Sequence, residues 1–192
     1  MLCNFRTYSV AVVLAVLAGC GSSDDDDDAL VCGPLVTPDV NEGGIGDFSN
    51  DPANPTEFAL APGVNSLVNG LMQGNPDYVA FTVDACDVLT GITLTDFTSN
   101  EVGNIAFVAI QSGPTFTVTP EEAPTSTSEL DGFTHFSANE IGTDILALAG
   151  QEPDAIGFTT PLGPGTYTMW LNQTGAESEH TLVFNVERVL VP

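Results

Sequence analysis

Short runs in which apolar and polar residues alternate, separated by Gly, Pro, Asn and Asp, recur along the chain from about residue 56 onward. In residues 77–83 the alternation places Val79, Phe81 and Val83 on one side of an extended segment. A two-residue period is typical of a β-strand with one buried face, and helical periodicity is nearly absent. The sequence therefore predicts an all-β fold.

The predicted strands are numerous enough for two packed sheets. The clearest runs are residues 77–83, 89–96, 104–111, 165–173 and 180–187, and shorter ones are 56–60, 65–71, 116–119 and 133–137. Such a set fits a two-layer antiparallel, jelly-roll-like sandwich. We expect one short helix at residues 143–149, capped by Thr143 and ended by Gly150.

The first twenty residues have the layout of a lipoprotein signal peptide. Arg6 precedes an uninterrupted apolar run at residues 10–18, which at about 1.5 Å per residue is too short to span a hydrocarbon core of about 30 Å. The following Leu17-Ala18-Gly19-Cys20 resembles a bacterial lipobox. We expect cleavage before Cys20 and acylation of its thiol, which holds the chain to a membrane. An ordinary secretory signal is the alternative. Because Gly21 replaces the aspartate that commonly retains lipoproteins in the inner membrane, the outer membrane is favoured.

A strongly acidic segment follows the predicted cleavage site. Asp24 to Asp28 form an unbroken run without an apolar neighbour, so we expect residues 20–31 to be a solvated linker and residues 32–192 to be one β-sandwich domain. Removal of residues 1–19 takes Arg6 away and leaves one cation against 26 acidic residues, a net charge of −25. A field of that sign repels phosphate backbones, which excludes nucleic acid as a partner.

Two of the four cysteines are available for a disulfide in the mature chain. Cys3 is lost with the signal peptide and Cys20 carries the acyl group, which leaves Cys32 and Cys86 in an oxidising compartment. We expect these two to be bridged, which would stabilise the domain by about 4 kcal/mol.

Several blocks of sequence, in order, resemble a known group of proteins. The blocks are residues 46–51, 75–83, 105–113, 141–146 and 161–175. They resemble exported bacterial β-sandwich proteins, many of which end in a PEP-CTERM sorting tail, and they are distantly similar to pre-peptidase C-terminal domains. The resemblance implies a jelly-roll-like module without an established reaction. No such tail is visible at Val191-Pro192, and we expect anchoring at Cys20 to replace it.

Motifs for catalysis are not visible in the sequence. There is no Gly-x-Ser-x-Gly elbow and no His-Glu-x-x-His, and the cysteines that remain are assigned to the disulfide. The two histidines, His135 and His180, lie in alternating strand patterns, where we expect exposed or hydrogen-bonded side chains. We therefore expect no enzymatic activity and no catalytic residues.

Oxygen-bearing side chains cluster near a glycine-rich loop. Asp47, Asn50 and Asp51 supply ligands of the kind that calcium accepts, and Asp77 at the next strand can join them. The resemblance to calcium-stabilised extracellular sandwiches supports a Ca²⁺ site. The alternative is a set of Asx turns, in which these side chains bond their own backbone.

Trp170 is a candidate ligand residue because it is the only tryptophan and has the opposite parity to Tyr167, Met169 and Leu171. An outward-facing tryptophan beside His135 can stack on a sugar ring. The alternative is packing beneath a loop.

The sequence thus predicts a membrane-anchored exported lipoprotein whose sandwich is a binding or envelope-structural module without catalysis. Its expected partners are the lipid bilayer, through Cys20, and a glycan or an envelope protein. Two alternatives stay open: a carbohydrate-binding surface lipoprotein that uses Trp170, and a hydrolase whose site the motifs do not reveal.

Overall fold

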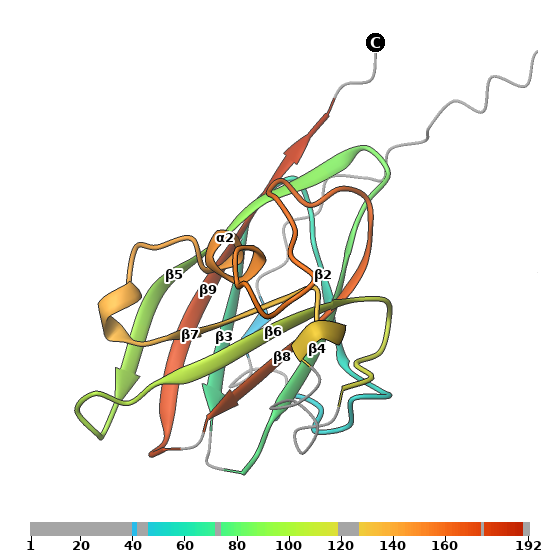
Figure 1. Cartoon of the computed structure of the whole chain (residues 1–192). Helices are drawn as coiled ribbons and strands as arrows, with labels where there is room; N and C mark the ends of the chain where they lie inside the picture. Colours follow the sequence, from blue (N-terminus) through green and yellow to red (C-terminus); the bar gives the residue numbers. More distant parts are fainter. Residues whose placement is uncertain (1–39, 42–45, 72–73, 119–126, 174, 190–192) are drawn as a thin grey trace, which may run out of the picture.

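A computed structural model describes residues 40–41, 46–71, 74–118, 127–173 and 175–189 (Figure 1). The predicted signal peptide, the linker, Cys20 and Cys32 lie outside the described residues. Of the helices in the described ranges, none is long and apolar enough to cross a membrane.

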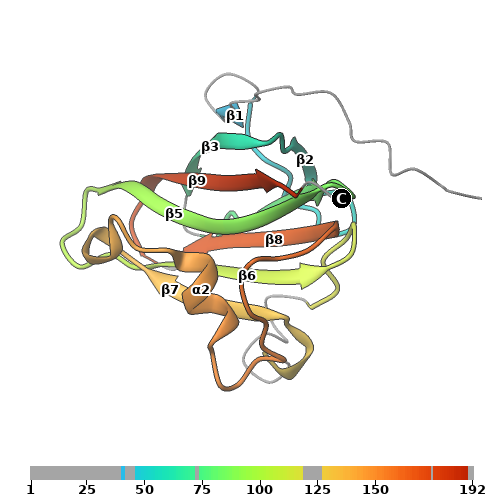
Figure 2. The same cartoon turned by 90° about the horizontal axis from the view of Figure 1, so that it is seen from above.

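The described residues form two packed β-sheets, which confirms the all-β sandwich. One sheet has four strands in the order β1-β3-β9-β5, and the other has five in the order β2-β4-β8-β6-β7. Figure 2 shows β3, β9 and β5 in one layer above β8, β6 and β7. The strands are β1 (Val40–Asn41), β2 (Thr56–Ala59), β3 (Gly63–Leu71), β4 (Asp77–Val83), β5 (Asp87–Ser99), β6 (Ala106–Ser112), β7 (Gly132–Phe136), β8 (Gly165–Gln173) and β9 (Ser178–Arg188).

The core between the sheets is built from alternate residues of facing strands. Phe81 of β4 and Phe58 of β2 both contact Phe184 of β9 edge-on, with ring centroids 5.4 and 5.0 Å apart. Edge-to-face pairs of this kind stabilise by about 0.5–1.5 kcal/mol beyond the burial of their area. The inward parity predicted for Val79, Phe81 and Val83 is therefore confirmed.

The short helix lies against β5 at one edge of the sandwich (Figure 2). It is α2 (Ile145–Gly150), with two 3-10 turns, η1 (Thr127–Glu129) and η2 (Ala138–Glu140), elsewhere. Asp144, and not Thr143 as predicted, is its N-cap, and its Oδ1 also accepts a hydrogen bond from the backbone N–H of Ile92 at 3.0 Å. Gly91 permits this approach, since a Cβ there would lie 2.9 Å from the Asp144 carboxylate. Asp144 caps the helix in place of Thr143 because the same carboxylate accepts hydrogen bonds from both the helix and the sheet.

Two other details differ from the prediction. The sheets are not purely antiparallel, because the edge pairs β1–β3 and β2–β4 are parallel. The predicted strand at residues 116–119 is wrong for the part described, residues 116–118, which lie in a loop. Phe116 and Val118 alternate because both are buried against the outer face of the five-stranded sheet, and burial alone gives that pattern without strand pairing.

Candidate ligand-binding groove

The four predicted calcium ligands do not come together. Asp47 and Asn50 lie on an exposed loop and both contact Asn75, a residue absent from the predicted set. Asn50 Nδ2 donates to Asn75 Oδ1, and Asn75 Nδ2 lies 3.4 Å from the Asp47 carboxylate oxygens. Within the described ranges, no group of three or more His, Cys, Asp or Glu side chains is arranged to hold a metal ion.

Asp51 forms an Asx turn, the alternative considered for this segment. Its Oδ1 accepts from the Ala53 backbone N–H at 2.9 Å, and its Oδ2 accepts from Asn54 Nδ2 at 2.7 Å. These bonds, the one from Asn54 first, lower the pKa of Asp51 from its ordinary value of 3.8. The carboxylate therefore shapes the residues 51–54 loop.

Asp77 does not lie with the other predicted calcium ligands. It has the inward parity of β4, so its side chain points between the two sheets. It is fully buried, and its Oδ2 accepts a hydrogen bond from Asn69 Nδ2 at 2.9 Å. Gln173, Ser178 and His180 are buried at the same end of the sandwich, and Ser178 donates to Gln173 across the two sheets. This end of the interior is polar.

For His180, the prediction of an exposed or hydrogen-bonded side chain on a strand is wrong. It is 0% exposed, its ring lies 5.0 Å from that of Phe136, and neither ring nitrogen has a hydrogen-bond partner among the described residues. Burial lowers its pKa from 6.5 to about 3. The sequence does indicate this burial, since residue 180 shares the parity of Leu182 and Phe184, which face the core.

Trp170 faces away from the main core, as its parity predicted, but it does not form an exposed stacking surface. It is 3% exposed and packs among Tyr78, Phe107 and Phe116, with centroids 6.2, 5.1 and 5.8 Å away. His135 is exposed nearby, with Phe107 between it and the indole. Packing beneath a loop, the alternative considered, is what the structure shows.

Cys86 is buried in the turn before β5 and is disulfide-bonded. Cys32 lies outside the described residues, so the pairing of these two cysteines stays a prediction.

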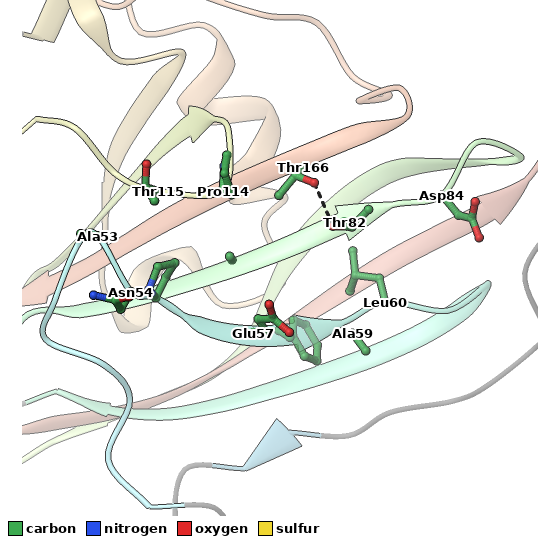
Figure 3. Close-up of a pocket in the computed structure, with 13 residues that line it drawn as sticks. Ala53, Asn54, Glu57, Ala59, Leu60, Thr82, Asp84, Pro114, Thr115 and Thr166 are labelled. Carbon is green, nitrogen blue, oxygen red and sulfur yellow. Dashed lines mark hydrogen bonds between the residues drawn. The ribbon is translucent and has the colours of Figure 1, made fainter.

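A groove lies on the outer face of the five-stranded sheet (Figure 3). It has a volume of about 770 Å³. Its floor is formed by small side chains of β4 and β8, namely Ala80, Thr82 and Thr166, and the Thr82 and Thr166 hydroxyls are hydrogen-bonded at 3.0 Å. The sequence does not reveal this site because its residues are ordinary outward-facing strand positions.

Two loops form a wall of the groove, and hydrogen bonds hold them in place. Residues 53–55 come from one loop, and Pro114 and Thr115 come from the other. The Phe116 N–H donates to Pro52 O at 2.8 Å and joins the loops, while Thr168 Oγ1 donates to Gly113 O at 2.8 Å. The phenyl ring of Phe116 also packs on Trp170, so the buried cluster on the outer face of the five-stranded sheet supports the wall.

Loss of the Asp51 carboxylate should loosen this wall. In Asp51→Ala we expect the Ala53 amide to exchange with solvent several-fold faster, because its acceptor is gone. Asp154→Ala, at another exposed turn, is the control and should leave Ala53 unchanged. Hydrogen exchange followed by NMR measures both. Equal exchange of Ala53 in the wild type and Asp51→Ala would contradict the assignment of the turn.

The electrostatic character of the groove is acidic. Glu57 of β2 is exposed at its side and Asp84 lies at its end, and no residue that lines it is basic. The one Lys or Arg in the described ranges, Arg188, does not line the groove and is paired with Asp87, with its Nε 3.1 Å from Asp87 Oδ1. The groove can therefore accept a neutral or cationic group and repels an anion.

Comparison with known proteins assigns no function to the fold or to the groove, because no protein-family model and no curated protein matches the chain. The function is therefore inferred from the N-terminal segment, the charge of the chain and the geometry of the groove.

Proposed function

We propose that this chain is an exported lipoprotein, held to a membrane through acylated Cys20, whose β-sandwich is a binding or envelope-structural module without catalysis of its own. The observation that carries the proposal is the apolar run at residues 10–18 followed by Leu17-Ala18-Gly19-Cys20 at its end. Two or more acyl chains hold a protein stably at a bilayer, so no further membrane segment is required.

The segments after Cys20 support the same proposal. The acidic run from Asp24 to Asp28 suits a solvated spacer between lipid and domain. The sandwich at the end of that spacer offers a groove large enough for a few side chains of a partner. Membership of the group of exported sandwich proteins, and an outer-membrane location, belong to this proposal as well.

Replacement of Cys20 tests the anchor. In Cys20→Ser we expect the protein to move from the membrane fraction to the soluble periplasmic or culture fraction, because serine cannot form the thioether that carries the diacylglyceryl group. Fractionation and immunoblotting of both proteins measure the distribution. Ser22→Ala, two residues away, is the matched control and should remain with the membrane. A Cys20→Ser protein that stays fully membrane-bound would contradict the proposal.

The carbohydrate-binding alternative relied on stacking of a sugar on Trp170. That side chain is buried beneath Phe116 and its neighbours, so it offers no exposed face to a sugar. No contact of His135 within the described residues favours the hydrolase alternative.

A further inference from the structure

Five polar side chains are buried together between the sheets at one end of the sandwich. They belong to Asn69 of β3, Asp77 of β4, Gln173 of β8, and Ser178 and His180 of β9, and each residue is at most 2% exposed. Asn69 donates to Asp77 and Ser178 donates to Gln173, and both bonds cross from one sheet to the other. Asn69 is also the cross-strand neighbour of His180 in the β3–β9 register, so the five side chains form one cluster.

Three of these side chains carry hydrogen-bonding atoms that have no partner among the described residues. The atoms are Asn69 Oδ1, Gln173 Nε2 and the two ring nitrogens of His180. Buried polar atoms in native proteins are nearly always hydrogen-bonded, either to protein or to ordered water. A buried group without a partner loses its hydration and gains nothing in return. Four such atoms in one cluster therefore indicate a hydrogen-bonding ligand in the interior.

The chemistry of the four atoms identifies the kind of ligand. Asn69 Oδ1 is an acceptor, and Gln173 Nε2 is a donor because Gln173 Oε1 accepts from Ser178. Burial lowers the pKa of His180 to about 3, so its ring is neutral at ordinary pH and supplies one donor and one acceptor. A metal cation binds acceptors alone, whereas water both donates and accepts and makes about three hydrogen bonds when buried. The mixed set suits water.

The cluster also lies close to the protein surface. Ser178, whose hydroxyl bonds to Gln173, is among the residues that line a surface pocket of about 310 Å³. Gly70, Ser99 and Glu177 line the same pocket, at the ends of β3, β5 and β9. A short route therefore leads from solvent to the cluster, and a bound water can exchange without separation of the sheets.

We infer that this cluster is a binding site for ordered water, which bridges Asn69 and His180 of the four-stranded sheet to Gln173 of the five-stranded sheet. The inference goes beyond the proposed function and does not depend on the lipid anchor. The bridge supplies the missing hydrogen bonds of all three side chains. It also joins the two sheets at the end where the interior is polar.

The first test is a high-resolution crystal structure of the mature chain in its soluble Cys20→Ser form, whose interior is unaltered. We expect a water oxygen within about 2.7–3.2 Å of a His180 ring nitrogen, Asn69 Oδ1 and Gln173 Nε2. An occupant at about 2.0–2.6 Å from its ligands would be a metal ion and would overturn the inference. Elemental analysis of the same sample, before and after dialysis against EDTA, checks that result.

The second test observes the water in solution. In the ¹⁵N-labelled Cys20→Ser protein we expect magnetisation transfer from water to the side-chain amide of Gln173, with rotating-frame detection to separate it from chemical exchange. His180→Phe removes both ring nitrogens and should weaken this transfer roughly twofold or more, because the water loses polar partners. His135→Phe, the same substitution at an exposed histidine, is the control and should leave it unchanged.

Absence of water at the stated distances in the crystal structure would overturn the inference, and so would transfer to Gln173 of equal strength in His180→Phe and the parent protein. The crystal structure needs no substitution in the interior, so the inference stays testable if His180→Phe does not fold. Fractionation of Cys20→Ser decides the lipoprotein proposal separately, so failure of one does not imply failure of the other.

Discussion

Trp170→Ala is expected to lower the free energy of unfolding by about 3–5 kcal/mol. The indole is buried between the five-stranded sheet and the loop that carries Phe116, and its removal leaves a cavity that Tyr78 and Phe107 cannot fill without shifting. For a domain of this size, each kcal/mol corresponds to roughly 2–4 °C, so the midpoint of thermal unfolding should fall by about 6–20 °C.

The control for Trp170→Ala is a truncation at the surface. Val102 is 103% exposed, and Val102→Ala should change the free energy of unfolding by less than about 0.5 kcal/mol. Urea unfolding of the three proteins measures both changes. A loss below about 1 kcal/mol in Trp170→Ala would show that the loop does not cover the indole and would reopen sugar stacking on it.

His180 should make the protein lose stability as the pH falls below about 6.5. Burial lowers the pKa of His180 to about 3 in the folded protein, while in the unfolded chain it returns to 6.5. The unfolded state therefore binds the proton more readily, so the associated loss begins near pH 6.5, grows by about 1.4 kcal/mol per pH unit and levels off near pH 3. Between pH 7.5 and pH 5 the expected loss is about 2 kcal/mol.

The pH experiment compares, within each protein, how the free energy of unfolding changes with pH. A variant of lower overall stability can therefore still be used. In His180→Phe the ring can still pack on Phe136, but no proton is taken up, and the loss between pH 7.5 and pH 5 should disappear. His135→Gln is the control, because His135 is exposed, and it should keep the wild-type slope. Urea unfolding at each pH gives the free energies. Equal slopes in the wild type and His180→Phe would contradict the assignment.

The fold could be predicted from the sequence to the extent that alternation reports burial. Residues 77–83 and 165–173 match β4 and β8 at both ends, because strong alternation and turn residues coincide there. The same rule failed at Phe116 and Val118, since loop residues buried on a sheet alternate as strand residues do. Strand β1 was missed because its two residues, Val40 and Asn41, are too few to show a period.

The site residues were less predictable, because their roles depend on which strands become neighbours. Asp77 looked like a surface ligand from its position in the sequence, and its pairing with Asn69 exists only once β3 and β4 face each other. Thr82 and Thr166 meet because β4 and β8 are adjacent, although 84 positions separate them in the chain. Local patterns carry no information about such pairings.

The most direct test of the lipid anchor is mass spectrometry of the N-terminal peptide of the protein purified from membranes. We predict that the mature chain starts at Cys20 and that this residue carries the added mass of a diacylglyceryl group. A chain that begins at any other residue, or a Cys20 with an unmodified thiol, would contradict the central claim that this acidic β-sandwich is displayed from a lipid surface.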